Sequence, residues 1–135
     1  MATTSVNELF FDLDGSTGLP SIETQLLATT GASKVSLIGI VRPHISAATG
    51  SKLMDLEVRI ELSNDGSIWV DSGITPVTKP YTAGASLPHQ FAPEKISLFG
   101  DVKGAAYVRA VYELKTADTT LQGTLLVTAT LSVGL

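Results

Sequence analysis

The sequence predicts an all-β protein, a single-domain antiparallel β-sandwich or jelly roll with one long proline-rich loop. Three observations lead to this fold class. Apolar and polar residues alternate over several strand-length segments, turn-forming residues separate these segments, and no window of eleven or more residues has the apolar spacing of a helix. The chain has 135 residues, a length that fits one domain.

The first part of the chain contains a polar segment followed by weak strand signals. Residues 1–7 match no pattern, so we predict a flexible N-terminal arm and a sandwich domain over residues 8–135. Segment 34–42, KVSLIGIVR, is apolar on both faces at its centre, which is typical of a central strand covered on both sides. We expect Pro43 to end this strand, because proline cannot donate to a β-ladder. The weaker strands are predicted at residues 8–13, 23–29, 34–42 and 95–99.

Two segments keep a helical alternative. Segment 21–28, SIETQLLA, begins with a serine and has a nearby glutamate, so one short capped helix is an alternative to a strand. Segment 45–54, ISAATGSKLM, is the best other helical candidate, although Gly50 interrupts it.

The strongest strand signals lie in two later regions. In residues 56–63, LEVRIELS, apolar and polar residues alternate strictly. An Asn-Asp-Gly-Ser turn follows and leads into the apolar segment Ile68-Trp69-Val70. Residues 55–73 are therefore predicted to form a β-hairpin. Residues 108–115 and 121–133 alternate in the same way around a turn at Ala117–Thr119. We predict that these two strands pair as a second hairpin.

Residues 75–93 form the predicted proline-rich loop, with four prolines in TPVTKPYTAGASLPHQFAP. Loops of this length in compact domains are usually functional or disordered. Its aromatic residues Tyr81 and Phe91, with His89 between them, are candidates for contact with a partner, since aromatic anchors often dominate binding energy.

Composition excludes several classes of function. The net charge is −4 and the chain has no basic cluster, which argues against nucleic-acid binding. No apolar run approaches 18 residues, no signal peptide is recognisable, and no cysteine is present for a disulfide or a thiolate site. Charged residues make up 16% of the chain, against about 25% in an average soluble domain. Either other protein covers part of the surface, or the surface is neutral and rich in Ser, Thr and Gly.

The stretch FFDLDGSTG resembles the first motif of the haloacid dehalogenase phosphatases, in which Asp12 would be the nucleophile and Asp14 the acid/base. The later motifs and the helical crossovers of that family are missing, so we predict that the chain is not an enzyme. A calcium loop at Asp12, Asp14 and Ser16 offers three oxygen ligands, short of the six to eight that Ca²⁺ prefers. We therefore predict no catalytic residue, cofactor or metal, and interpret the stretch as a strand that ends in a turn.

Residues 57–71, EVRIELSNDGSIWVD, resemble a hairpin common in β-sandwich proteins of phage virions, and also the equivalent hairpin of discoidin-type sugar- or lipid-binding domains. Discoidin-type domains are usually cysteine-bridged and begin with a motif leading to another tryptophan, and this chain has neither feature. The virion resemblance implies a structural protein, most typically a decoration or cement protein that stabilises the phage head. A tail or head-completion component is an alternative, as is a carbohydrate-binding or adhesion module with Trp69 and Tyr81 as stacking residues.

The virion interpretation also implies partners and a location. We expect the major capsid protein or other virion proteins as partners, a homo-oligomer with a trimer favoured, and the virion, assembled in the host cytoplasm, as the location. Nucleic acid and membrane are not expected as partners. Besides the N-terminal segment 1–8, the candidate contact residues are Phe10, Phe11, Trp69, Tyr81, His89 and Phe91.

Overall fold

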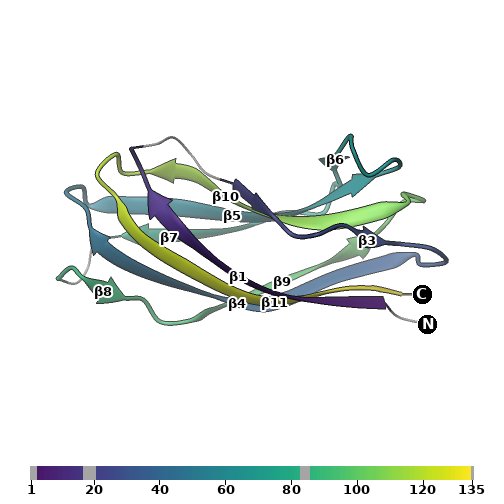
Figure 1. Ribbon diagram of the computed structural model, residues 1–135, viewed down its shortest axis with the longest axis horizontal. Helices are drawn as coiled ribbons and strands as arrows, with labels where there is room; N and C mark the ends of the chain where they lie inside the picture. The colour runs from purple at the N-terminus through teal and green to yellow at the C-terminus, as the bar shows by residue number, and fades with distance from the viewer. Residues whose placement is uncertain (1–2, 17–20, 83–85, 135) are drawn as a thin grey trace.

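The computed structural model describes residues 3–16, 21–82 and 86–134, with all of their side chains except those of Thr3 and Phe11. Two antiparallel sheets pack face to face around one apolar core (Figure 1). The described residues form strands, turns and loops, and none of them forms a helix, so no helix in this part of the chain spans a membrane. The predicted all-β sandwich is confirmed.

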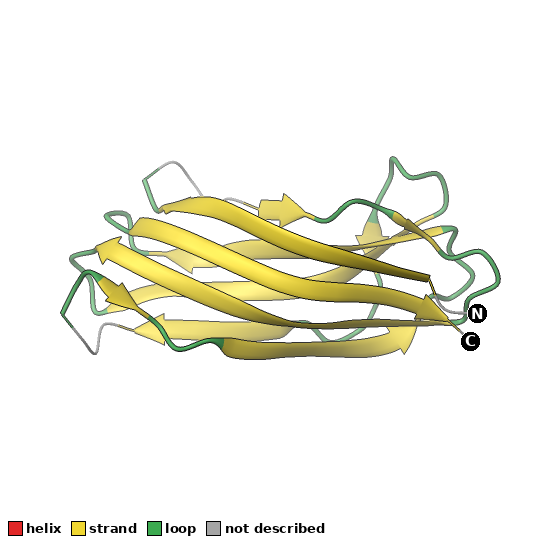
Figure 2. Ribbon diagram, turned by 60° about the horizontal axis from the view of Figure 1, so that its bottom comes forward, coloured by secondary structure: helices red, strands yellow, loops and turns green. Residues whose placement is uncertain are grey.

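The first sheet is built around β4 (Lys34–Ala47), and we call it the β4 sheet. On one side β4 pairs with β11 (Gln122–Gly134), which pairs in turn with the edge strand β1 (Thr3–Asp14). On its other side β4 pairs with β9 (Glu94–Asp101) and the short β8 (His89–Gln90). Figure 2 shows the long, twisted strands of this sheet.

The second sheet is built around β5 (Lys52–Ser63), and we call it the β5 sheet. β5 pairs with β10 (Tyr107–Ala117), whose free side carries two short strands, β2 (Ser21–Glu23) and β3 (Leu27–Ala28). The opposite side of β5 carries β6 (Val70–Asp71) and β7 (Val77–Thr82). The predicted hairpin over residues 55–73 is present, although its second strand has only two residues.

The predicted pairing of residues 108–115 with 121–133 is wrong. β10 lies in the β5 sheet and β11 in the β4 sheet, so the turn between them crosses from one layer to the other. Alternation shows that one face of each strand is buried, and both sheets bury a face against the same core. The pattern therefore identifies each strand correctly but does not select its neighbour.

The N-terminal arm and the end of the strand at Pro43 also need correction. β1 begins at Thr3, and residues 3–7 pair with β11, so only residues 1 and 2 of the predicted arm lie outside the described structure. β4 continues through Pro43 to Ala47. Pro43 stands beside the gap between β8 and β9, where its carbonyl accepts a hydrogen bond from the Phe91 N–H (3.0 Å). No strand needs an N–H from Pro43 there, which explains why β4 tolerates it.

The remaining corrections concern loops and helical alternatives. The predicted loop over residues 75–93 contains β7 and β8, so it is partly ordered in strands. Segment 45–54 forms the end of β4 and the start of β5 rather than a helix. Segment 21–28 contains β2 and β3, which resolves the two alternatives in favour of strands.

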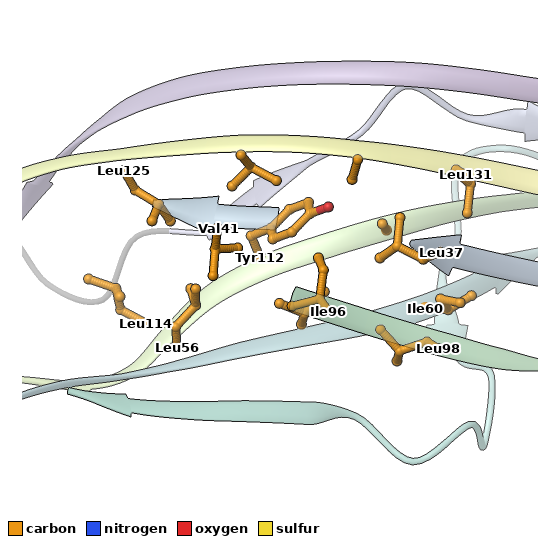
Figure 3. Packing of buried hydrophobic residues seen from close by; sticks show 14 of the residues in the cluster. Leu37, Val41, Leu56, Ile60, Ile96, Leu98, Tyr112, Leu114, Leu125 and Leu131 are labelled. Atoms are coloured by element: carbon orange, nitrogen blue, oxygen red, sulfur yellow. The ribbon is translucent and has the colours of Figure 1, made fainter. Parts of the chain in front are cut away.

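The core lies between the sheets and takes one face of every long strand. Figure 3 shows Leu37 and Val41 from β4, Leu125 and Leu131 from β11, and Tyr112 from β10 in this layer. All five are essentially inaccessible to solvent. Removal of such side chains from water is the main stabilising contribution, about 25 cal/mol per Å² of apolar surface.

Candidate binding surfaces

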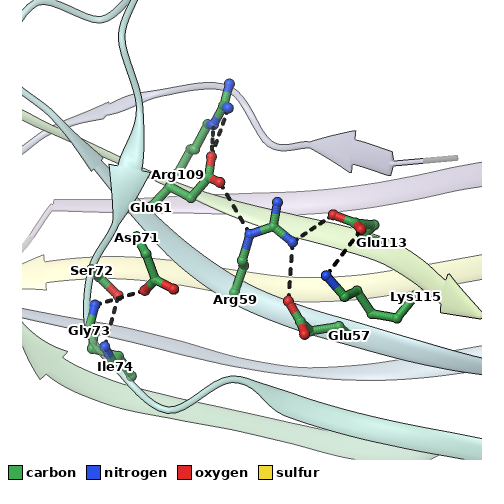
Figure 4. Close-up of polar contacts among 10 residues, drawn as sticks. All are labelled: Glu57, Arg59, Glu61, Asp71, Ser72, Gly73, Ile74, Arg109, Glu113 and Lys115. Atoms are coloured by element: carbon green, nitrogen blue, oxygen red, sulfur yellow. Dashed lines mark hydrogen bonds and ion pairs between the residues drawn. The ribbon is translucent and has the colours of Figure 1, made fainter. Parts of the chain in front are cut away.

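The outer face of the β5 sheet is covered by charges that pair with one another (Figure 4). Arg59 lies at its centre and contacts Glu57 (3.2 Å), Glu61 (3.2 Å) and Glu113 (2.8 Å) through its guanidinium nitrogens. Arg109 donates to the same Glu61 carboxylate (2.7 Å). This face of β5 and β10 therefore satisfies its charges within the chain.

The ionisation of this network follows from its contacts. Partial burial lowers the pKa of Arg59, but the hydrogen bonds to Glu113 and Glu61 outweigh burial and raise it above the ordinary value. The hydrogen bond from Arg59 in turn lowers the pKa of Glu113 below its usual 4.5. Both shifts favour the charged forms, so the contact between Arg59 and Glu113 is an ion pair at neutral pH.

The outer face of the β4 sheet has a different character. Four large apolar side chains on it are between 55% and 73% exposed: Val6, Phe10, Ile38 and Phe99. Ile40 and Leu126 lie half-buried among them, and Ser and Thr hydroxyls fill most positions between. We call this surface the β4 face. It provides the apolar area that a partner would cover.

Charges lie at the two sides of the β4 face. Glu8 and Asp12 lie on β1, at one edge of the sheet, whereas Arg42 lies on β4 and Lys95 on β9, towards the other. The strand register places Glu8 and Lys95 in one row across the sheet, with Thr128 and Ile40 between them. Apart from the Lys34–Asp101 ion pair between β4 and β9, the face is thus acidic on one side and basic on the other.

A second apolar surface surrounds the tip of the β5–β6 hairpin. Ile68 and Val70 are exposed there and line a cavity of about 430 Å³ together with Asp71 and Lys103. The exposed Leu26 packs beside the same turn, with its Cδ2 3.4 Å from the place of a Cβ on Gly66. We call Leu26, Ile68 and Val70 the tip patch.

The turn that carries the tip patch is fixed by Asp65. Its carboxylate accepts hydrogen bonds from the N–H groups of Ser67 (2.8 Å) and Ile68 (2.9 Å). These bonds lower the pKa of Asp65, since they favour the charged form. Gly66 has a positive φ of 79°, which explains the Asp-Gly pair at this position. The sequence thus encodes a rigid loop that displays Ile68.

Two of the predicted contact residues lie on these surfaces. Phe10 belongs to the β4 face, and Trp69 lies beside the tip patch, half-buried. The Arg109 guanidinium carbon lies 4.3 Å from the centroid of the Trp69 ring, a cation–π contact that occupies one face of the ring. Phe11 lies in β1, and its side chain lies outside the described structure.

Tyr81, His89 and Phe91 come together as an aromatic cluster. The Phe91 ring packs edge-on against Tyr81 (centroids 5.3 Å apart) and His89 (4.7 Å). Tyr81 is only 3% exposed and points into the core, which corrects the expectation that its ring is displayed on a loop. His89 and Phe91 are half-buried. Phe91 also lines a cavity of about 240 Å³ with Phe10, Arg42 and His44.

The stretch FFDLDGSTG forms the end of β1 and a turn. The Asp14 carboxylate accepts hydrogen bonds from the backbone N–H (2.9 Å) and hydroxyl (2.7 Å) of Ser16. Asp12 is exposed on the outer face of an antiparallel sheet, which lacks the parallel strands of a phosphatase site. Among residues 3–16, 21–82 and 86–134, no three His, Asp or Glu side chains gather as a metal site would require.

Sequence patterns did not single out Val6, Ile38 or Phe99, nor the exposure of Leu26, Ile68 and Val70. One signal for the β4 face was present, because KVSLIGIVR is apolar on both sides. The prediction that β4 is a central strand is correct, but the described part of the chain covers only one of its faces.

Comparisons with known proteins show a shared fold. No protein-family model matches the chain, and no curated protein matches it in sequence. A carbohydrate-binding module specific for non-crystalline cellulose, CBM28, has a similar structure, with a TM-score of 0.52 and 10% identity over 89% of this chain and 69% of that chain. The K1 cleaved adhesin domain of Lys-gingipain from Porphyromonas gingivalis W83 has a TM-score of 0.49 and 9% identity, over 100% of this chain and 99% of that chain. VP2 of infectious bursal disease virus has a TM-score of 0.44 and 13% identity, over 98% of this chain and 36% of that chain. At 10% identity the likeness to CBM28 shows the β-sandwich fold alone.

Proposed function

We propose that this chain is a non-enzymatic structural protein of a phage virion, a decoration or cement protein that binds the assembled head. The observation that carries the proposal is the presence of two separate apolar surfaces, the β4 face and the tip patch. A protein with two such surfaces on one rigid sandwich is suited to bridging neighbours in a shell. The outer face of the β5 sheet, whose charges pair with one another within the chain, would face the solvent.

Two further observations support the virion interpretation. The hairpin that resembles those of virion proteins is the element that displays the tip patch, with Asp65 and Gly66 fixing its turn. The low charged fraction of 16% agrees with the large apolar side chains that are exposed on these two surfaces. In this proposal the tip patch contacts the major capsid protein, and the protein is located in the virion.

The carbohydrate-binding alternative has weaker support. Its stacking residues would be Trp69 and Tyr81, but Tyr81 is buried and Arg109 covers one face of Trp69. Stacking on a sugar requires an open ring face at the surface. A tail or head-completion role shares the chemistry of the favoured proposal and differs only in the partner.

Co-sedimentation with capsid shells tests the proposal. The shells are assembled from the major capsid protein of the phage to which this proposal assigns the chain, and we expect saturable binding at a fixed stoichiometry. The double variant Ile68→Asp/Val70→Asp should lower shell affinity at least tenfold, because it places charges in the tip patch. The control Thr78→Asp adds a charge at an exposed position of β7 and should bind as the wild type does. Absence of binding to shells, together with binding on a glycan array, would overturn the proposal in favour of the carbohydrate module.

A further inference from the structure

No element among the described residues covers the β4 face. Its four exposed apolar side chains come from three strands, β1, β4 and β9, and all point away from the core. The remaining exposed large apolar side chains among the described residues belong to the tip patch. Apolar side chains gathered on one sheet face, with charges at its sides, mark an interaction surface.

We propose that the β4 face is a homodimer interface, in which a second copy of this chain packs face to face about a twofold axis parallel to the strands. The proposal stands independently of shell binding. It replaces the trimer implied by the virion resemblance with a twofold assembly, because one surface that pairs with itself closes as a dimer.

The charge pattern selects this axis. A half-turn about an axis parallel to the strands, between β11 and β4, places β1 of one copy over β9 of the other and keeps each row in register. Glu8 of each copy then faces Lys95 of the other, because these residues share a row. A half-turn about an axis across the strands would place β1 over β1 and bring the acidic sides together. Opposite charges in facing positions favour the first arrangement over the second.

The Glu8–Lys95 contact is impossible within one chain. The two residues lie on strands separated by β11 and β4, so three strand spacings, about 14 Å, separate their backbones. Among the ion pairs of the described residues, neither Glu8 nor Lys95 takes part in one. A second copy supplies each of them with a partner of opposite charge.

The apolar contacts fit the same arrangement. Ile38 of one copy would face Thr130 of the other, since these two residues are opposite each other in the register of β4 and β11. Phe99 would face the N-terminal end of β1 in the same way, because Ser36 and Ser132 link Phe99 to Thr4 across the sheet. Ile38 and Phe99 thus meet small hydroxyl-bearing side chains, an arrangement that lets two sheets approach closely. Leu126 of one copy meets Arg42 of the other, whose aliphatic stem can pack against it.

The size of the face is sufficient for a specific dimer. Four strands about 4.8 Å apart, each contributing about nine residues at 3.4 Å, give roughly 600 Å² per copy before side-chain relief is counted. Specific interfaces bury about 800 Å² per partner, with the smaller ones near 600 Å². A sandwich face of this area therefore reaches the range of stable complexes.

A charge-swap experiment in sedimentation velocity tests the proposal. We expect the wild type to be a dimer, and Glu8→Lys or Lys95→Glu alone to raise the dissociation constant at least tenfold, since each change acts twice in a symmetric interface. The double variant Glu8→Lys/Lys95→Glu should restore the dissociation constant to within a few-fold of the wild type. Because the pair cannot form within one chain, this rescue reports contact between copies.

Apolar variants provide the matched control. Ile38→Asp should dissociate the dimer, with association at least a hundredfold weaker. The matched variant Ile68→Asp should remain dimeric, because Ile68 is also an exposed isoleucine but lies in the tip patch. Far-UV circular dichroism of each variant confirms that it folds. A monomeric wild type at high concentration, or an oligomer unaffected by Ile38→Asp or not rescued by the double swap, would overturn the proposal. Shell binding lost with Ile68→Asp/Val70→Asp while the dimer persists would separate the two proposals.

Discussion

Gly15 shows at the scale of single residues why the Asp-Gly turn occurs after β1. A Cβ added at Gly15 would lie 1.8 Å from the carbonyl oxygen of Asp118, which any side chain would overlap. The Gly15 N–H donates to the Leu121 carbonyl (3.0 Å), so the turn is tied to the start of β11. The hydrogen bonds from Ser16 lower the pKa of Asp14. These residues, which suggested an enzyme, fulfil the requirements of a turn.

A buried hydroxyl provides the prediction at this scale. The Tyr112 side chain is inaccessible to solvent, and its hydroxyl oxygen has no hydrogen-bond partner among the described residues. A buried polar atom left without a partner costs about 1–3 kcal/mol. We therefore expect Tyr112→Phe to raise the free energy of unfolding by about 1 kcal/mol, measured by urea denaturation. The control is the half-exposed Tyr107, because Tyr107→Phe should change the free energy of unfolding little. A clear loss of stability in Tyr112→Phe would contradict the prediction.

At the scale of elements, the two sheets divide the surface into unlike faces. The ladder between β5 and β10 places Arg109 opposite Glu61 and Glu57 opposite Glu113, and Arg59 pairs with both of these facing glutamates. The β4 face carries mainly apolar and hydroxyl side chains instead, and separates Glu8 from Lys95 by the width of the sheet. The first face pairs its charges within the chain, whereas the second exposes apolar side chains that the proposed interface would cover.

The charged face makes stability depend on pH. The pKa of Glu113 is lowered in the folded protein, so its stabilising contribution is fully present above the ordinary value of 4.5 and is lost as pH falls through the folded pKa. Glu113→Gln should therefore lower the free energy of unfolding at pH 7 by about 1 kcal/mol or less. The difference between variant and wild type should shrink as pH falls below about 4, measured by urea unfolding across pH.

A matched variant distinguishes this effect from loss of any charge. Glu23 is exposed in β2 and forms no ion pair with the described residues. Glu23→Gln should leave the unfolding free energy nearly unchanged at every pH. A destabilisation by Glu113→Gln that is the same at pH 3 and pH 7 would show that the contact with Arg59 is not the cause.

At the scale of the whole molecule, one core and one proposed interface link folding to association. Both sheets contribute to the same buried cluster, so we expect far-UV circular dichroism and Trp69 fluorescence to report a single unfolding transition. Dimerisation through the β4 face should raise the thermal midpoint as protein concentration increases, because association stabilises the folded state. Ile38→Asp should remove this concentration dependence. Two separate transitions would contradict the single core, and a concentration-independent wild type would contradict the interface.

Local patterns in the sequence determined the strands. The alternation in residues 56–63 and 121–133 depends only on which face of each strand is buried, so β5 and β11 were predictable. The turn chemistry of Asp65-Gly66 and Asp14-Gly15 was predictable for the same reason, since the bonds of a turn join residues close in sequence. The apolar centre of KVSLIGIVR correctly predicted a central strand.

The tertiary structure decided which strands became neighbours and which side chains remained exposed. β10 and β11 adjoin in sequence yet lie in different sheets, because pairing depends on contacts between distant segments that alternation does not encode. Tyr81 is buried because β7 pairs with β5, and Ile38 is exposed because no element of the described chain covers the β4 face. The sequence by itself therefore determined an all-β chain with a low fraction of charged residues. Only the packing of the two sheets decided where that apolar surface lies.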